Sequence, residues 1–325
     1  MKNSAQLRQL GKSDLWVSGV GFGCWPIAGI SSLDVTDEWS IKTLQAAFAA
    51  GINFFDTAFS YGYDGESDRL LRIALSDRRD QVVLASKVGS HYDQDRRRMV
   101  DGRPATLIDQ AAKLLKRLAI EHVDLLYLHQ PDPAVAIEES AGALAEIVGR
   151  GWARYAGVSN VNADQLNRFH AICPVVAVQP PFNMLQQSEW LAIRDICSQH
   201  SISGVCYWVL MKGLLAGKME RDHKFDPRDR RLTYDIYQGE KWQRSQNFLD
   251  RLRSLSAELG CTVSQLVIAW TIRQPGIAVA LCGAKRPDQI EETALSMSLN
   301  LDAATMELID GWLAETNASP AVATR

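Results

Sequence analysis

The sequence predicts an α/β protein built as a (β/α)8 TIM barrel, with an N-terminal β-hairpin and extra C-terminal helices. Three observations support this fold: short β-branched or apolar runs recur along the chain, most are followed by a segment of helical period, and eight such runs are present. Alternating strands and helices favour parallel pairing, and eight parallel strands close a barrel. The whole chain, residues 1–325, is assigned to one barrel domain.

The predicted strands are short apolar segments at residues 19–23, 53–56, 82–86, 123–129, 154–159, 175–179, 204–207 and 278–282. Segments between them, such as 37–50, 106–118 and 137–148, carry apolar residues at the spacing of one helix face. Gly51, Gly151 and Gly260 follow helical segments, where a C-cap requires positive φ. These elements alternate in the order that a barrel needs.

A doubly wound sheet is the main alternative fold. Its dinucleotide fingerprint, G-x-G-x-x-G, is matched only loosely by Gly19-Val20-Gly21-Phe22-Gly23-Cys24. No helical segment follows directly, and no acidic residue closes a second strand about 20 residues later. The barrel is therefore the better prediction.

Two segments interrupt the alternation of strands and helices. Residues 6–10 and 15–17 flank Gly11-Lys12-Ser13-Asp14, which predicts a small hairpin able to plug the barrel floor. Residues 211–241 form a long polar stretch, and a loop of that length inside a compact domain is usually functional or mobile.

The composition is typical of a soluble globular protein, with 46% hydrophobic and 22% charged residues. The net charge of −3 gives no general attraction to nucleic acid. No apolar run reaches the roughly 18 residues of a membrane helix, and the N-terminal segment lacks the apolar core of a secretory signal. The six cysteines are scattered without metal-ligand spacing, so reduced thiols, no metal and a cytoplasmic location are expected.

Four titratable residues fall at or just beyond the carboxyl ends of neighbouring predicted strands, where barrel enzymes carry their chemistry: Asp56, Tyr61, Lys87 and His129. Each alone has a structural explanation: a helix cap, a rim aromatic, a surface cation and a core histidine. Together they predict a general acid. A lysine ammonium lowers the pKa of a neighbouring tyrosine toward working pH, an aspartate holds that ammonium, and a histidine orients a carbonyl oxygen.

At these residues the chain resembles the aldo-keto reductase superfamily over nearly its whole length. The matching segments are Phe55-Asp56-Thr57-Ala58 with Tyr61-Gly62, Ser86-Lys87-Val88-Gly89, and Asp124 to His129. The resemblance implies that Tyr61 donates the proton to a small-molecule carbonyl substrate, that Lys87 and Asp56 tune it, and that His129 positions the substrate.

The same resemblance implies an NADP(H) site formed by later segments of the chain. The implied cofactor-binding residues are Ser159, Asn160, Gln179, Tyr207, Trp208, Leu210, Gly213, Gly283, Lys285, Gln289 and Glu292. Adjacent cations at Lys285 and Arg286 favour NADP over NAD, unless they only form a solvated helix start. Trp208 stands where the family usually has serine, and Thr293 where asparagine commonly reads the adenine, so both local contacts are open.

Other rim residues have competing interpretations. Trp25 is a candidate for the substrate pocket or simple rim packing, and Phe59 and Phe182 are weaker candidates. Arg96-Arg97-Arg98 is interpreted as a solvated charge run rather than a substrate-phosphate site.

Two other functions remain alternatives to a reductase. One is a cofactor-binding redox sensor, as channel-associated members of the superfamily are. The other is a barrel lyase in which Lys87 forms a Schiff base.

Overall fold

A closed barrel of eight parallel strands forms the centre of the computed structural model, which describes residues 7–30, 32 and 34–318. In chain order the barrel strands are β3 (Val20–Gly23), β4 (Phe54–Asp56), β5 (Val83–Val88), β8 (Val123–Leu128), β9 (Ala153–Ser159), β10 (Val175–Gln179), β11 (Ser203–Cys206) and β12 (Ile277–Cys282). Neighbouring strands follow this order, and β12 pairs with β3 to close the ring. The predicted fold class is confirmed, and every predicted strand lies within two residues of an observed one.

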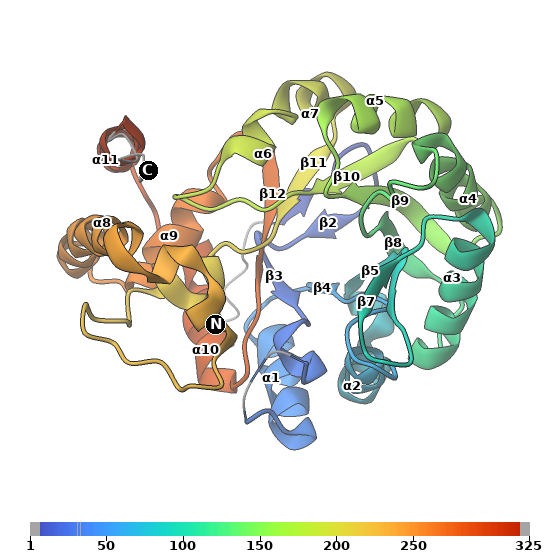
Figure 1. The fold of residues 1–325 in the computed structure, drawn as a ribbon, viewed down its shortest axis with the longest axis horizontal. Helices are drawn as coiled ribbons and strands as arrows, with labels where there is room; N and C mark the ends of the chain where they lie inside the picture. Colours follow the sequence, from blue (N-terminus) through green and yellow to red (C-terminus); the bar gives the residue numbers. More distant parts are fainter. Residues whose placement is uncertain (1–6, 31, 33, 319–325) are drawn as a thin grey trace.

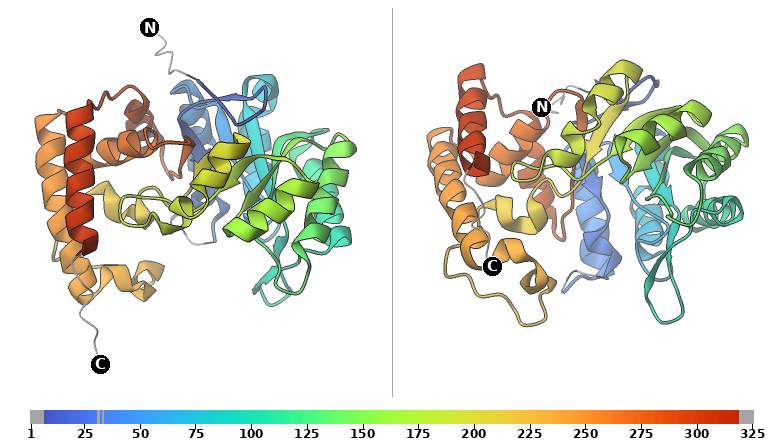
Figure 2. Two further views of the ribbon diagram at one scale, coloured as in Figure 1. Left: turned by 90° about the horizontal axis from the view of Figure 1, so that it is seen from above. Right: turned by 45° about the horizontal axis from the view of Figure 1, so that its top comes forward.

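Helices surround the barrel as an outer layer (Figure 1). They are α1 (Asp37–Ala49), α2 (Glu66–Leu75), α3 (Pro104–Leu118), α4 (Ile137–Gly149), α5 (Ala163–Ile172), α6 (Ser188–Leu191), α7 (Arg194–His200), α9 (Val263–Thr271) and α10 (Pro287–Ala294). Two long helices, α8 (Gly239–Glu258) and α11 (Ala303–Ala318), run side by side outside this layer, as Figure 2 shows. Arg251 of α8 contacts Glu315 of α11 at 2.6 Å. The predicted extra C-terminal helices are therefore present.

The predicted N-terminal hairpin also forms, from β1 (Arg8–Gln9) and β2 (Trp16–Val17). Its buried Leu10, Leu15 and Val17 pack with residues of the barrel interior, including Phe54 and Val176. The backbone of the connecting turn approaches β10 and β11 closely, since the amide of Gly11 donates to Ser203 Oγ at 2.9 Å. The hairpin thus plugs the amino-terminal end of the barrel with apolar side chains.

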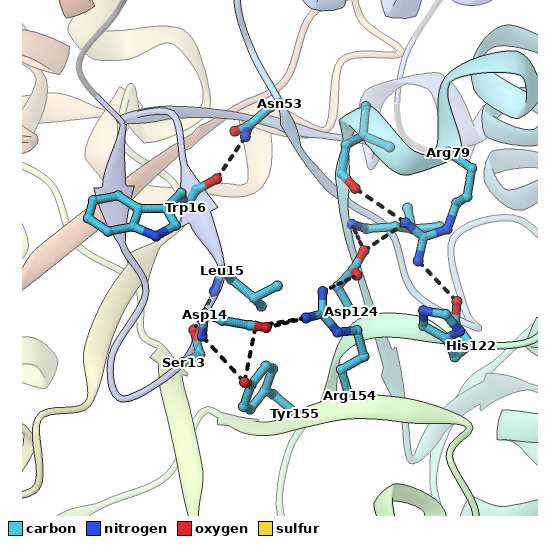
Figure 3. A network of polar contacts seen from close by, with 12 residues as sticks. Ser13, Asp14, Leu15, Trp16, Asn53, Arg79, His122, Asp124, Arg154 and Tyr155 are labelled. Atoms are coloured by element: carbon cyan, nitrogen blue, oxygen red, sulfur yellow. Dashed lines mark hydrogen bonds and ion pairs between the residues drawn. The ribbon is translucent and has the colours of Figure 1, made fainter.

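A polar network holds this floor together (Figure 3). Asp14 of the hairpin accepts hydrogen bonds from Arg154 Nη2 at 2.7 Å and from the Tyr155 hydroxyl at 3.1 Å. Arg154 also contacts the buried carboxylate of Asp124 at 3.2 Å, and Arg79 contacts the same carboxylate at 2.8 Å. Charges from the hairpin, β8 and β9 are therefore paired in one cluster at the amino-terminal face.

Two segments differ from the sequence-based expectation. The stretch 211–241 contains three short 3-10 helices, Met211–Ala216, Arg230–Thr233 and Asp235–Tyr237, and α8 already begins at Gly239. The segment after β5 folds into an antiparallel hairpin of β6 (Ser90–Tyr92) and β7 (Arg98–Val100). This hairpin projects beyond the barrel (Figure 2).

Candidate functional site

The residues expected to act together meet at the carboxyl-terminal face of the barrel. Parallel strands present their carboxyl ends on one face, so residues far apart in the chain become neighbours there. Asp56 ends β4, Lys87 lies one residue before the end of β5, and His129 follows β8 directly. Ser159 ends β9 and Gln179 ends β10.

Lys87 is the centre of a buried hydrogen-bond cluster. Its Nζ donates to Asp56 Oδ1 at 2.5 Å, to the Thr57 carbonyl at 2.9 Å and lies 3.1 Å from the Tyr61 hydroxyl. The side chains of Lys87 and Asp56 are each only 1% exposed. An ion pair at this burial needs its remaining donors satisfied, and all three lysine protons have an acceptor here.

A tight turn after β4 brings Tyr61 over this cluster. The turn uses Gly62 at φ 113°, a conformation that favours glycine, and a Cβ there would lie 1.9 Å from Glu66 Oε2. Trp25 packs edge-to-face on the Tyr61 ring with centroids 5.2 Å apart, and His129 lies on another side at 6.1 Å. This contact fits both interpretations of Trp25, rim packing and one wall of a substrate pocket.

The electrostatic environment corrects one sequence-based expectation. Burial raises the pKa of Tyr61, and the opposing effect of Lys87 does not bring it below its ordinary value. Tyr61 therefore keeps its proton at neutral pH. Burial lowers the pKa of His129 well below its ordinary value, and the positive charges of Lys87 and Arg98 lower it further. The imidazole is therefore neutral. The expected net lowering of the Tyr61 pKa is wrong because desolvation outweighs the ammonium.

The same cluster argues against the Schiff-base alternative. Burial acts to lower the pKa of Lys87, but Asp56 and Tyr61 outweigh it and raise the pKa above its usual value. Burial raises the pKa of Asp56, against the effect of Lys87 and of a hydrogen bond from Gln179. A lysine held as an ammonium with three acceptors lacks the free amine that a nucleophile requires.

Side chains expected to hold the nicotinamide end of the cofactor join this cluster through direct hydrogen bonds. Gln179 Nε2 donates to Asp56 Oδ2 at 2.9 Å, and Ser159 Oγ donates to the main-chain carbonyl of Gln179 at 2.7 Å. Asn160 Nδ2 donates to the His129 carbonyl at 2.9 Å, and the Tyr207 hydroxyl donates to Asn160 Oδ1 at 2.7 Å. The expected cofactor and catalytic residues therefore form one connected network.

The turn after β11 has an unusual backbone. Trp208, Met211, Lys212 and Gly213 all have positive φ, and Leu210 lies between them. The Trp208 indole is 43% exposed, and Lys212 Nζ lies 4.4 Å from its ring centre and 3.0 Å from that of Tyr234. An exposed aromatic and a cation thus stand where the resembling family has a serine. The indole supplies stacking surface there instead of a hydroxyl donor.

The segment expected to hold the adenosine end follows β12. Gly283 packs closely against Pro26. A Cβ atom at position 283 would lie 2.4 Å from the proline ring. The Lys285 amide donates to Gln289 Oε1 at 2.9 Å, and Arg286 contacts Asp288 at 3.1 Å. Thr293 is buried, so its side chain offers little to a ligand.

One orphaned atom in this segment fits a ligand that donates hydrogen bonds. Glu292 Oε2 contacts Lys218 at 2.9 Å, while Glu292 Oε1 is buried and has no partner among the described residues. A buried carboxylate oxygen without a donor is costly, and an adenine amino group or a ribose hydroxyl would satisfy it. The residues present therefore fit an adenine dinucleotide.

Two rim aromatics lie differently from the sequence-based expectation, and one rim arginine makes a contact that the sequence did not suggest. Phe182 is 1% exposed and stacks on Trp270, which removes it from the substrate pocket. Phe59 lies under the guanidinium of Arg117 at 4.2 Å. Arg96, Arg97 and Arg98 are all exposed, as expected of a solvated run, and Arg98 in addition places Nη2 at 3.2 Å from His129 Nε2. The register of the β6–β7 hairpin brings Arg98 close to His129. The sequence did not predict this hairpin, because its two strands are too short to show a strand period.

Comparison with known proteins assigns the chain to a protein family. A family model described as the aldo/keto reductase family matches residues 19–314. This chain belongs to the aldo/keto reductase family. Aldo-keto reductase YhdN from Bacillus subtilis is 31% identical over 306 residues, covering 93% of this chain and 92% of the relative. The NADH-specific methylglyoxal reductase of Escherichia coli is 28% identical and covers 92% of this chain and 96% of its own.

A solved structure agrees with the same assignment. The glycerol dehydrogenase of Gluconobacter oxydans superposes with a TM-score of 0.90 at 28% identity, covering 99% of both chains. Members of the family are generally oxidoreductases that act on small carbonyl or alcohol compounds with nicotinamide cofactors, and the family assignment supports an enzyme of this general kind. Among the described residues, no helix has the length and apolar character needed to cross a membrane.

Proposed function

We propose that this chain is a cytoplasmic, NADPH-dependent reductase of aldehydes or ketones that also oxidises alcohols or sugars in reverse. The observation that carries the proposal is the contact of the Tyr61 hydroxyl with Lys87 Nζ at 3.1 Å, above the buried Lys87–Asp56 pair. The six cysteines, all among the described residues, are free thiols, which supports a reducing compartment.

The residues of the site have complementary roles in this reaction. Bound NADPH would supply the hydride that the carbonyl carbon accepts. Tyr61, protonated at neutral pH, gives its proton to the carbonyl oxygen, and solvent later returns one. The ammonium of Lys87 stabilises the phenolate that Tyr61 leaves, and Asp56 fixes the ammonium in position. The neutral imidazole of His129 can donate a hydrogen bond to the same carbonyl oxygen.

The preference for NADPH over NADH rests on the cations after β12. Lys285 and Arg286 come just before α10, where the helix dipole also favours a phosphate. The Arg286 guanidinium is engaged by Asp288, so a 2′-phosphate would compete with that carboxylate for Arg286, and Lys285 would add a second positive charge.

A substrate screen tests the proposal directly. The purified protein is mixed with aldehydes, ketones and sugars in the presence of NADPH or NADH, and with alcohols in the presence of the oxidised cofactors, while nicotinamide absorbance is followed. We expect oxidation of NADPH with at least one carbonyl compound and a lower kcat/KM with NADH. Absence of turnover with every substrate, despite tight cofactor binding, would instead favour a redox sensor.

A further inference from the structure

The proposed reaction leaves the position of Arg98, at the mouth of the site, unexplained. It begins β7, opposite Tyr92 of β6, and its side chain is directed from the hairpin toward the end of β8. Arg98 Nη2 lies 3.2 Å from His129 Nε2 and 3.5 Å from Ser90 Oγ. A guanidinium carried on an exposed hairpin therefore reaches the imidazole that faces the reacting position.

The charge of Arg98 is uncompensated within the described residues. Two other arginines of this region form ion pairs: Arg97 with Asp95 at 3.7 Å and Arg103 with Asp101 at 2.5 Å. Arg98 forms no such pair in the described ranges, and the Lys87 ammonium below it is already matched by Asp56. One unmatched positive charge thus remains beside the catalytic imidazole. A guanidinium in this setting is suited to a planar oxyanion, which it can bind through two parallel hydrogen bonds.

We propose that Arg98 is a specificity-determining residue that binds a carboxylate or phosphate carried by the substrate, close to the reacting carbonyl. The inference rests on the proposed reductase function and narrows its substrate class to anionic aldehydes and ketones. Because the guanidinium lies one hydrogen bond away from His129 Nε2, the anion and the carbonyl must be separated by only a few bonds. Short oxo acids and phosphorylated short aldehydes meet this requirement.

Because Arg98 contacts His129, the anionic group of the substrate would have a second effect. A guanidinium has only donors, so Arg98 occupies the lone pair of Nε2 and leaves the proton of the neutral ring on Nδ1. A carbonyl oxygen, however, needs a proton on the nitrogen that faces it. An anionic substrate draws the guanidinium onto its own oxygens and releases Nε2, whereas a neutral substrate must displace Arg98 without compensation. The anion therefore improves orientation as well as binding.

Matched substrate pairs and two variants test this inference. The acids are 4-oxobutanoate and glyceraldehyde 3-phosphate, and their neutral partners are methyl 4-oxobutanoate and glyceraldehyde. The kcat/KM of each is measured with NADPH for the unmodified protein, Arg98→Gln and Arg97→Gln. Arg97 is the matched control, since it is exposed and paired with Asp95 on the same hairpin.

We expect the unmodified protein to prefer at least one anionic substrate over its neutral partner. Arg98→Gln should lower kcat/KM for that anionic substrate by about 10- to 100-fold, the range expected for a charge-assisted hydrogen bond, and should leave the neutral partner unchanged or faster. Arg97→Gln should change neither. A lower kcat/KM of Arg98→Gln for 4-oxobutanoate shows that Arg98 binds a carboxylate. A lower kcat/KM for glyceraldehyde 3-phosphate shows that it binds a phosphate.

Two other outcomes separate this inference from the function on which it rests. If neutral aldehydes are reduced and Arg98→Gln affects both members of each pair equally, Arg98 does not read an anion although the reductase function stands. If no carbonyl compound of either charge is reduced by the unmodified protein, the reductase function itself is wrong.

Discussion

The partly buried Tyr61 hydroxyl lies 3.1 Å from the Lys87 ammonium, which is itself buried against the carboxylate of Asp56. This relationship joins a loop residue to a strand residue across 26 positions of the chain. In the proposed reaction, Lys87 acts mainly after Tyr61 has given up its proton. The resting tyrosine stays protonated because burial raises its pKa, and the ammonium becomes most favourable only when the phenolate forms.

Removal of the Tyr61 hydroxyl should separate cofactor binding from turnover. Tyr61→Phe keeps the ring that packs on Trp25 but has no proton to give. We expect kcat for carbonyl reduction to fall by roughly 100- to 10,000-fold, as for loss of a general acid, with the Kd for NADPH little changed. Stopped-flow kinetics and fluorescence titration measure the two quantities. Tyr63→Phe, at an exposed ring that packs edge-to-face with Tyr92, is the control and should retain activity.

Neutralising the cations after β12 should change cofactor preference. We expect the double variant Lys285→Ala/Arg286→Ala to bind NADPH about 10- to 100-fold more weakly, because a phosphate loses its charge-assisted contacts, while NADH binding stays nearly constant. Arg286→Ala alone should have the smaller effect, since Asp288 already engages that side chain. Calorimetric titration with both cofactors measures this, and an equal loss for NADPH and NADH would remove the 2′-phosphate assignment.

Stability should depend on pH through Asp68, which is fully buried beside the active-site loop. Burial raises its pKa from 3.8 to about 7, although a hydrogen bond from Thr57 and the charge of Arg117 oppose this. A raised carboxyl pKa means that the folded protein binds more protons than the unfolded chain between these values. Asp68 therefore contributes stability near pH 5 that is lost as pH rises through 7.

Asp68→Asn removes this pH dependence and supplies the test. Between pH 5 and pH 8 the unfolding free energy of the unmodified protein should fall relative to that of the variant by roughly 2–3 kcal/mol. Denaturant titrations at both pH values measure the difference. If the difference in unfolding free energy between the unmodified protein and Asp68→Asn stays constant with pH, Asp68 does not titrate in this range.

The polar network at the barrel floor should contribute to stability without affecting catalysis. Asp124→Ala leaves Arg79 and Arg154 without their shared carboxylate, which is 6% exposed. Because both arginines remain partly solvated, we expect a loss of about 1–3 kcal/mol, less than for a fully buried pair. Chemical denaturation measures this loss, and kcat should be unaffected. Asp164→Ala, which breaks an exposed pair with Arg168, is the control and should change stability little.

The sequence predicted those parts of the molecule that depend on local pattern and chain order. Strand β8 is an uninterrupted apolar run apart from Asp124, and its end places His129 by barrel geometry alone. The Tyr61 pKa could not be predicted in the same way, because its direction depends on how completely the side chain is desolvated. The position of Arg98 could not be predicted either, because it depends on the register of a hairpin whose strands are only three residues long. The start of α8 at Gly239 was hidden because its first turn, Gly239-Glu240-Lys241, is polar.

The hairpin that plugs the barrel has a consequence for how the chain folds. The first residues to be synthesised contact partners that arrive much later: Asp14 awaits Arg154, and Gly11 awaits Ser203, 192 positions along the chain. Until those strands exist, Leu10, Leu15 and Val17 have no apolar interior to enter. We therefore expect hairpin docking to be a late step with high contact order, so that nascent chains shorter than about 200 residues expose this apolar turn to chaperones.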